Sequence, residues 1–304
     1  MIIFGGAGFL ARNLIAASPD WEITTFDLAP WAGDIRHHRH IVGDVLDPLA
    51  VREAIEGAEL AFLRHGVLGG PHSIATDQCR KYLAINAESV MSILSSCDHV
   101  GCRRVIMDSS EQVFGQSGDL SLLSAYVEPS PMNFYGATKL VAEKALGMWT
   151  MAQPDRSAQV FRYSRFRAPD TKDVIYHFVR ASLVNRPIQI KTNPNHKISF
   201  VHVSDVIAAN RVALTRTPRF ATYNVSCERP IALYDLAQRV KAMTRSTAPI
   251  EIEFDTQSGL NFEPFVTGME WESSAEELGV APRYGVDAMV RQTIALLRED
   301  HDKI

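Results

Sequence analysis

The chain has 304 residues, of which 46% are hydrophobic and 22% are charged, a composition typical of a globular protein. Its 31 Lys and Arg residues against 35 Asp and Glu residues leave a net charge of −4, which excludes a general attraction to nucleic acid or to an anionic membrane. The four cysteines form no C-x-x-C pair, as in a reduced, cytoplasmic protein. We also expect no membrane span and no signal peptide, because no apolar run is long enough.

Short apolar runs alternate with helical patterns through the first half of the chain. The runs that predict strands fall at residues 1–4, 21–27, 40–47, 59–66, 103–110 and 158–166. The patterns that predict helices fall at residues 9–18, 49–58 and 82–101, with a further helix from about residue 134. Strands and helices that alternate in this way predict an α/β fold, in which a parallel sheet has helices on both faces.

The pattern becomes irregular after Arg167. Prolines interrupt it, and regular elements return only near residues 198–214 and 221–226. We predict a first domain over residues 1–166 that takes back a segment near residues 200–226. A smaller second domain over residues 167–304 would be interwoven with it.

One basic block, residues 36–40, contains His37, His38 and His40. We interpret this block as a solvated loop. A metal site is the alternative interpretation, but no acidic or cysteine partner stands at a ligand spacing, so we expect no metal.

A pattern of small residues follows the first predicted strand. Gly5, Gly8 and Ala11 stand in the spacing G-x-x-G-x-x-A, and Phe9 and Leu10 begin the next predicted helix. Small side chains let the backbone approach a pyrophosphate, whose charge is favoured by the helix N-terminus. We therefore predict that these five residues bind a dinucleotide.

Acidic residues stand at the ends of the next two predicted strands. The carboxylate of Asp27 can accept a hydrogen bond from a ribose 2′-hydroxyl and would repel a 2′-phosphate, which predicts NAD rather than NADP. Asp44 and its neighbour Val45 are candidates to meet the adenine. Asp44 taken alone is equally well interpreted as a turn or helix-cap residue.

Tyr135 and Lys139 are four residues apart on a predicted helix, so they share one face of it. A nearby ammonium stabilises a phenolate, and we expect Lys139 to lower the pKa of Tyr135 toward neutral pH. Ser110 ends the preceding apolar run and is placed to hold the oxygen that exchanges a proton with Tyr135. These three residues predict catalysis coupled to hydride transfer with a nicotinamide.

Together these motifs resemble the extended short-chain dehydrogenase/reductase superfamily, in its sugar-nucleotide epimerase/dehydratase branch. The resemblance covers nearly the whole chain and rests on "GGAGFLA", "GDVLD", "YGATK", "FVHVSDV" and the block "NAESVMSILSSCDHVGCRRVIMDSSEQVFG". It implies a Rossmann-type doubly wound parallel sheet that binds NAD, a smaller C-terminal substrate-binding domain, and a homodimer formed through a four-helix bundle. By the same resemblance, Ser110 binds the reacting hydroxyl and Tyr135 is the acid/base. Contacts with the cofactor are implied for Tyr135, Lys139 and Tyr163.

The chain departs from the pattern of that family in three segments. Leu63 takes the place of a usual His, and His65 and Gly66 replace small residues, which alters shape more than chemistry. Arg165 stands where many members carry an Asn that contacts the nucleotide-sugar. It suits a substrate carboxylate or phosphate, and a structural ion pair is an equal alternative. Ile198 stands where a diphosphate-binding Arg is usual, which weakens the assignment to a nucleotide-sugar.

The residues after Ser110 bear on the type of reaction. Dehydratases of the family are expected to carry two acidic residues here, whereas this chain has Glu111 and Gln112. A Gln cannot abstract a proton, so 4,6-dehydration is disfavoured. We predict that Ser110, Glu111 and Gln112 bind substrate, although a carboxylate hydrogen-bonded to the loop backbone is an equal alternative for Glu111.

These observations predict an NAD-dependent enzyme of the epimerase type, an isomerase that transiently oxidises and then re-reduces a hydroxyl of a sugar or sugar-nucleotide. The alternative is a net dehydrogenase or reductase of a small non-nucleotide substrate such as a sugar acid. A non-catalytic NAD-binding regulator is a third hypothesis, which the retained Ser110, Tyr135 and Lys139 disfavour. The expected partners are a small-molecule substrate and a second copy of the chain.

Overall fold

The computed structural model describes residues 1–32, 38–69, 76–115, 123–253 and 268–299. The chain divides into two compact units. The first comprises Met1–Gly115, Ala125–Tyr163 and Ile207–Asn224, and the second comprises the described residues within Gln116–Ser124, Ser164–Val206 and Val225–Ile304. Within the described residues, no helix is both long and apolar enough to cross a membrane.

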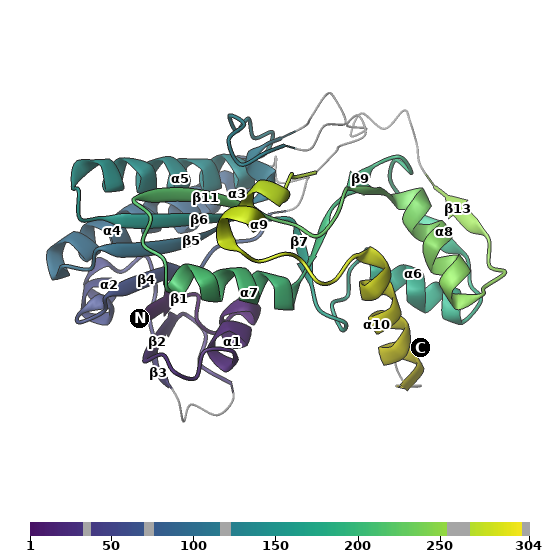
Figure 1. Cartoon of the computed structure of the whole chain (residues 1–304), viewed down its shortest axis with the longest axis horizontal. Coiled ribbons are helices and arrows are strands. Elements are labelled where there is room, and N and C mark those ends of the chain that lie inside the picture. The colour runs from purple at the N-terminus through teal and green to yellow at the C-terminus, as the bar shows by residue number, and fades with distance from the viewer. Residues whose placement is uncertain (33–37, 70–75, 116–122, 254–267, 300–304) are drawn as a thin grey trace. The chain divides into compact units, whose positions relative to one another are not determined.

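A seven-stranded sheet forms the centre of the first unit (Figure 1). Its strand order is β11-β6-β5-β4-β1-β2-β3, and the pairings from β6 through to β3 are parallel. The order changes direction at β1 and β4, as in doubly wound dinucleotide-binding folds. The predicted α/β fold is thereby confirmed. The strands are β1 (Ile2–Phe4), β2 (Ile23–Asp27), β3 (His38–Val42), β4 (Leu60–Leu63), β5 (Arg104–Ser110), β6 (Ser157–Tyr163) and β11 (Phe220–Val225).

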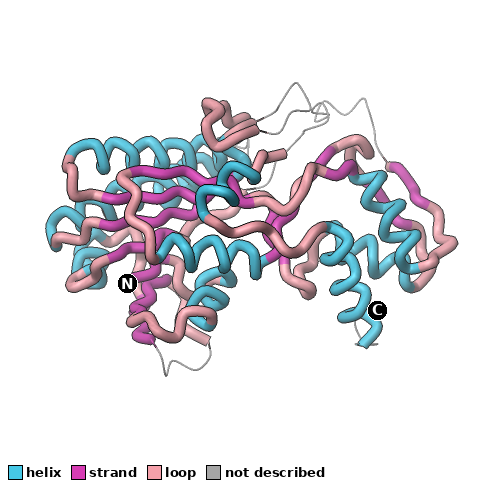
Figure 2. The backbone as a smooth tube through the Cα atoms, in the orientation of Figure 1, coloured by secondary structure: helices cyan, strands magenta, loops and turns pink. Residues whose placement is uncertain are grey.

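Helices cover both faces of this sheet, as Figure 2 shows. Ala158 and Val160 of β6 pack with α4 and α5, whereas Gln159 between them donates its amide to the carbonyl of Ala213 in α7 at 3.0 Å. Because side chains alternate along a strand, α7 lies on the face opposite to α4 and α5. The helical segments are α1 (Phe9–Ala16), α2 (Pro48–Ile55), α3 (Thr76–Leu83), the π-helical turn η1 (Ala84–Glu88), α4 (Ser89–Val100), α5 (Phe134–Ala152) and α7 (Val203–Leu214).

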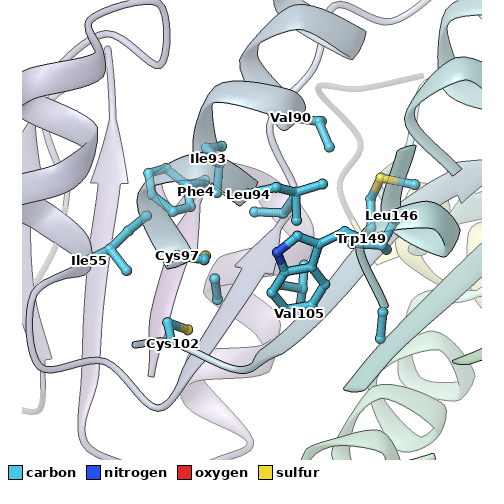
Figure 3. Packing of buried hydrophobic residues seen from close by; sticks show 14 of the residues in the cluster. Phe4, Ile55, Val90, Ile93, Leu94, Cys97, Cys102, Val105, Leu146 and Trp149 are labelled. Atoms are coloured by element: carbon cyan, nitrogen blue, oxygen red, sulfur yellow. The ribbon is translucent and has the colours of Figure 1, made fainter. Parts of the chain in front are cut away.

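The core beneath α4 and α5 is apolar (Figure 3). It packs Phe4 of β1 and Val105 of β5 with Ile93 of α4 and Trp149 of α5, all of them buried. Full burial of an aliphatic or aromatic side chain contributes about 1.5–3 kcal/mol. Because both of its faces are covered, β5 is buried along nearly its whole length, and its carboxyl end at Ser110 is held in a fixed position.

Two segments differ from the sequence-based prediction. The basic block is not simply a solvated loop, because His38–Val42 forms the edge strand β3 and the His40 Nδ1 lies 2.8 Å from the hydroxyl of Thr25. His37 lies outside the described residues, and the described part of the chain holds no cluster of three or more metal-ligating side chains. The strand predicted over residues 158–166 is divided in two, because β6 ends at Tyr163 and Arg165–Arg167 forms a separate strand that pairs with Phe200–His202.

The second unit has its own apolar core, in which α6, α8 and α10 pack against short strands. Arg167 is fully buried in this unit, where its guanidinium donates to the carboxylate of Asp173 at 3.0 Å and to the hydroxyl of Thr293 at 2.9 Å. The elements are β7 (Arg165–Arg167), α6 (Val174–Leu183), β8 (Ile188–Ile190), β9 (Lys197–Ile198), β10 (Phe200–His202), β12 (Ile231–Ala232), α8 (Leu233–Thr244), β13 (Ile250–Ile252), α9 (Glu272–Leu278) and α10 (Val286–Glu299).

Candidate active site

The carboxyl end of β5 carries three of the predicted site residues. Ser110 is the last residue of β5, and its Oγ accepts a hydrogen bond from the N–H of Gln112 at 3.2 Å. This bond begins a short helical turn, η2 (Glu111–Val113). Glu111 is 7% exposed, and its negative charge acts on Tyr135. Its carboxylate therefore lies inside the protein close to the proposed acid/base and not in solvent.

The amino end of α5 packs directly against η2. Asn133 caps α5, since its Oδ1 accepts from the N–H of Gly136 at 2.8 Å, and its Nδ2 donates to the Oε1 of Gln112 at 2.7 Å. Gly136 permits this approach, because a methyl group in its place would overlap the carbonyl oxygen of Gln112. Gln112 thus joins η2 to α5, and its predicted contact with substrate stays a prediction.

This junction brings Tyr135 to Ser110, and their side chains are hydrogen-bonded. Burial raises the pKa of Tyr135 to about 12, and the charges of Asp108 and Glu111 add to the rise, whereas the hydrogen bond from Ser110 opposes it. The expectation that Lys139 lowers this pKa toward neutral pH is therefore wrong. The phenol is a proton donor at neutral pH.

The reason is the direction in which the Lys139 side chain points. Its ammonium donates to the backbone carbonyl of Asp108 at 3.0 Å, so the charge is directed at β5. Burial lowers the pKa of Lys139, and the negative charges of Asp108 and Glu143 oppose that effect. Tyr135 and Lys139 do share one side of α5, as their spacing predicts.

A buried asparagine that the sequence analysis missed borders Lys139. Asn86 lies in η1, where its Oδ1 accepts from the N–H of Val67 at 2.8 Å and its Nδ2 donates to the carbonyl of Val67 at 3.1 Å. A methyl group at Gly66 would lie 3.0 Å from the Oδ1 of Asn86 and 3.3 Å from the Nζ of Lys139. Single π-helical turns are frequent at functional sites. The spacing of residues in the sequence does not predict this turn.

The loop between β1 and α1 fits the phosphates of a dinucleotide. Gly5 has a φ of +78°, and a side chain there would strike the backbone of His65. Gly8 precedes α1 in an extended conformation with no side-chain cap. The N–H groups of the first turn, such as that of Leu10, have no acceptor within the helix and are available to an anion. The same turn holds Phe9 partly exposed and Ala11 buried.

Asp27 stands at the carboxyl end of β2, where it was predicted. Its Oδ2 accepts from the N–H of Ala7 at 3.0 Å and its Oδ1 from the N–H of Ala29 at 2.9 Å. Each carboxylate oxygen retains a further lone pair, so the group is held in place and can still accept a bond from a ribose hydroxyl. Its charge fits NAD better than NADP.

Asp44 forms a turn after β3. Its Oδ1 accepts from the N–H of Leu46 at 2.9 Å, and the cap of α2 is Asp47 instead. The turn interpretation of Asp44 therefore describes its local structure. Contacts of Asp44 and the half-buried Val45 with an adenine stay predictions.

Tyr163 ends β6, the neighbour of β5, and is 4% exposed. Its hydroxyl donates to the Oδ1 of Asp108 at 3.0 Å and accepts from the Nδ2 of Asn210 at 2.7 Å. The hydroxyl is thus bonded within the protein, and the predicted contact of Tyr163 with the cofactor stays a prediction.

Two predicted positions belong to the second unit. Arg165 lies exposed in β7, so its guanidinium is not held in a buried ion pair. Ile198 is buried in the apolar core of that unit, at the position where the family resemblance implies a diphosphate-binding Arg. Both residues thus belong to a different unit from Ser110, Tyr135 and Lys139, and their predicted contacts with substrate stay predictions.

Comparison with known proteins identifies the family. The model of the NAD dependent epimerase/dehydratase family matches residues 1–226. The chain belongs to this family. Its cofactor is accordingly NAD, and the chain is an enzyme of the NAD-dependent epimerase/dehydratase group.

The curated relatives that the chain resembles are distant. A Sinorhizobium fredii protein named Uncharacterized protein y4nG is 24% identical over 96% of this chain and 77% of its own length. An Escherichia coli O157:H7 enzyme, N-acetyl-alpha-D-glucosaminyl-diphospho-ditrans,octacis-undecaprenol 4-epimerase, is 21% identical over 68% of this chain and 60% of its own length. The chain spans 41% of an Arabidopsis thaliana trifunctional UDP-glucose 4,6-dehydratase.

Several solved structures have the same fold as this chain. MoeE5 in complex with UDP-glucuronic acid and NAD matches with a TM-score of 0.81 and 21% identity over 98% of both chains. The UDP-glucuronic acid 4-epimerase of Bacillus cereus, in complex with UDP-glucuronic acid and NAD, matches with a TM-score of 0.82 and 16% identity over 98% of both chains. At these identities the likeness establishes the fold.

Proposed function

We propose that this chain is an epimerase-type enzyme that oxidises a hydroxyl of a nucleotide-sugar and re-reduces the ketone on its other face. One observation carries the proposal: η2 and α5 bring Ser110 and Tyr135 into hydrogen-bond contact at the carboxyl end of β5, with Lys139 on the same helix. Ligands of open α/β sheets bind beyond the carboxyl ends of the strands, where this cluster lies.

The three residues divide the work on the substrate oxygen. Ser110 donates a hydrogen bond and holds that oxygen beside Tyr135. The phenolate form of Tyr135 takes a proton from the hydroxyl in the oxidation, and the resulting phenol returns it in the reduction, so no net proton is consumed. NAD, when bound, supplies the acceptor and then the donor of the hydride. Lys139 and Asp27 are proposed to hold its nicotinamide and adenine riboses, respectively.

The residues after Ser110 favour epimerisation over dehydration. Elimination of water requires a base close to the C–H that is broken, and an amide cannot act as one. The amide oxygen of Gln112 is in addition occupied by Asn133. Glu111 is proposed to bind a substrate hydroxyl from its buried position.

We propose a UDP-sugar or UDP-sugar acid as the substrate. Support comes from solved structures of the same fold that contain UDP-glucuronic acid or UDP-glucose with NAD. The exposed guanidinium of Arg165 suits a carboxylate or a phosphate. A second candidate is the net oxidation or reduction of a small sugar acid, favoured by Ile198, whose apolar side chain cannot bind a diphosphate.

A screen with catalytic NAD separates the two candidates. The enzyme is incubated with UDP-glucose, UDP-glucuronic acid and free sugar acids, while products are followed by NMR and NADH by its absorbance. We expect an inverted UDP-sugar without accumulation of NADH. An oxidised product with one NADH for each molecule would favour the second candidate.

We further propose a cytoplasmic homodimer. The cytoplasmic location rests on the cysteine pattern, and all four cysteines are free thiols. The dimer rests on exposed apolar side chains of the adjacent helices α4 and α5, where Met91, Val141, Met148 and Met151 are 40–75% exposed.

A further inference from the structure

Four polar side chains close a buried ring next to the proposed active site. Arg64 follows β4, and its Nε donates to the Oδ2 of Asp108 in β5 at 2.8 Å. The Oδ1 of Asp108 accepts from Tyr163 at 3.0 Å, and Tyr163 accepts from Asn210 of α7 at 2.7 Å. The Nη2 of Arg64 donates to the Oδ1 of Asn210 at 2.9 Å, which closes the ring. All four residues lie in the first unit.

Asp108 connects this ring to Lys139. Its backbone carbonyl accepts from the ammonium of Lys139 at 3.0 Å, while its carboxylate accepts from Arg64 and Tyr163. A single residue of β5 therefore receives both cations. A shift of Asp108 would move the acceptor of Lys139 as well.

We propose that Arg64 and Asp108 are positioning residues, which keep the ammonium of Lys139 charged and correctly placed for NAD. This inference rests on the proposed role of Lys139 in holding the cofactor.

The charges around Lys139 support the assignment. The ammonium faces Asp108 on β5, Glu143 on α5 and His65 after β4. Burial lowers the pKa of His65 to about 3, so that ring is neutral and leaves the two carboxylates as the stabilising charges. Glu143 is also engaged by the guanidinium of Arg162 at 2.6 Å. Asp108 consequently has the larger part in keeping Lys139 charged, as the order of their effects on its pKa indicates.

Arg64 is needed because Asp108 is buried. Burial raises the pKa of Asp108, and the charges of Arg64 and Lys139, together with the hydrogen bonds from Tyr163 and Arg64, lower it. Without Arg64 the carboxyl of Asp108 would gain a proton at a higher pH. Lys139 would then lose the negative charge that stabilises its ammonium.

Stability alone does not account for the Arg64–Asp108 pair. A buried ion pair often contributes no more than an apolar pair of similar size, because both ions lose their hydration. Among the described residues, the Nη1 of Arg64 is also buried without a hydrogen-bond partner, which adds a cost. The guanidinium rests 4.4 Å from the ring centre of Phe62, which offsets part of it.

A double-mutant cycle on the affinity for NAD tests the inference, with titration calorimetry on the full chain at about pH 7 and pH 9. Asp108→Asn keeps the size of the side chain and removes its charge. We expect the Kd for NAD to rise about tenfold, within the usual range for coupled groups, and to rise more at the higher pH because Lys139 loses its proton earlier. In a Lys139→Met background the same substitution should change the Kd less than about twofold.

Asp173→Asn is the matched control, since it also removes the carboxylate of a buried Arg pair but lies in the second unit. It should lower stability and leave the NAD affinity unchanged. If Asp108→Asn does not fold, Arg64→Leu with Asp108→Ser removes both charges together and should weaken NAD binding by a similar factor.

An equal loss of affinity with and without Lys139 would overturn the inference, because Asp108 would then act independently of the lysine. An affinity for NAD that Asp108→Asn leaves unchanged would also overturn the inference. A Lys139→Met variant that binds NAD as tightly as the wild type would contradict the proposed function of Lys139 itself, and the inference with it.

Discussion

Tyr135 decides the pH dependence of the proposed reaction. Its phenol has a pKa of about 12 because it is buried, so the phenolate that oxidation requires is scarce at neutral pH. Between about pH 7 and pH 9 the phenolate fraction rises about tenfold for each unit. We expect the rate of single-turnover oxidation to rise with the same slope, measured by stopped-flow absorbance. A flat profile would show that Tyr135 is not the base.

His65 should make the stability of the chain depend on pH. Its Nε2 lies 2.7 Å from the hydroxyl of Ser89, which itself donates to the carbonyl of Ile85, so the His65 ring donates this bond in its neutral form. The pKa is about 3 in the folded chain and about 6.5 when unfolded. The folded state therefore binds fewer protons in this interval, and stability present above about pH 6.5 is lost as the pH falls toward 3.

His65→Gln removes this titration and keeps a donor for Ser89. Between about pH 6.5 and pH 5, the free energy of unfolding of the wild type should fall more steeply than that of the variant, by up to about 1.4 kcal/mol per pH unit. Denaturant unfolding at the two pH values measures the difference. Equal slopes would contradict the burial of a neutral His65.

At the scale of single residues, the sequence predicted that Ser110 lies beside Tyr135 and that Asp27 ends a strand, and both are so in the structure. The proposed catalytic roles of Ser110, Tyr135 and Lys139 stay predictions. Local spacing in the sequence was not sufficient for the pKa of Tyr135, because the lysine four residues away donates to Asp108 instead. Arg64 was also missed, since its partners Asp108 and Asn210 are 44 and 146 residues away. Contacts over such separations leave no periodic signal.

At the scale of elements, the packing of α5 against η2 positions the proposed catalytic groups Ser110 and Tyr135. Gly136→Ala should separate the two segments, because the added methyl group would overlap the carbonyl oxygen of Gln112. We expect a loss of stability of about 1–3 kcal/mol together with a loss of activity. Both are measured on the purified variant, by denaturant unfolding and in the epimerisation assay.

Gly147→Ala is the control in the same helix. The added methyl group would lie 3.6 Å from the ring of Phe220, an ordinary contact, so stability should rise by about 0.4–1 kcal/mol. If both alanine variants behaved alike, the close approach of α5 to η2 would not matter for the site.

The alternation of strands and helices was readable at this scale because each element has its own apolar period. The first and last residues of the elements were harder to predict from the sequence. The run over residues 158–166 predicts one strand, but β6 ends at Tyr163 and Arg165–Arg167 pairs with β10 as the separate strand β7. His38 and Arg39 read as part of a basic loop, yet they pair with β2 in the edge strand of the sheet.

At the scale of the whole molecule, the proposed homodimer accounts for the apolar side chains on α4 and α5. Met148→Glu with Met151→Glu places two charges among residues that are 64% and 75% exposed, so the fold should tolerate them. We expect a monomer by light scattering after gel filtration, against a dimer for the wild type. A variant that stays dimeric would place the interface elsewhere.

In the proposed reaction one hydroxyl is oxidised and re-reduced within a single enzyme complex, with Tyr135 exchanging the proton. The most direct measurement uses the nucleotide-sugar identified in the screen, labelled with deuterium on the carbon that carries this hydroxyl. We expect that the inverted product retains the deuterium, that NADH does not accumulate, and that Tyr135→Phe slows the conversion by about 10²–10⁴-fold. Loss of the deuterium to solvent, or an oxidised product with an equal amount of NADH, would contradict the proposed reaction.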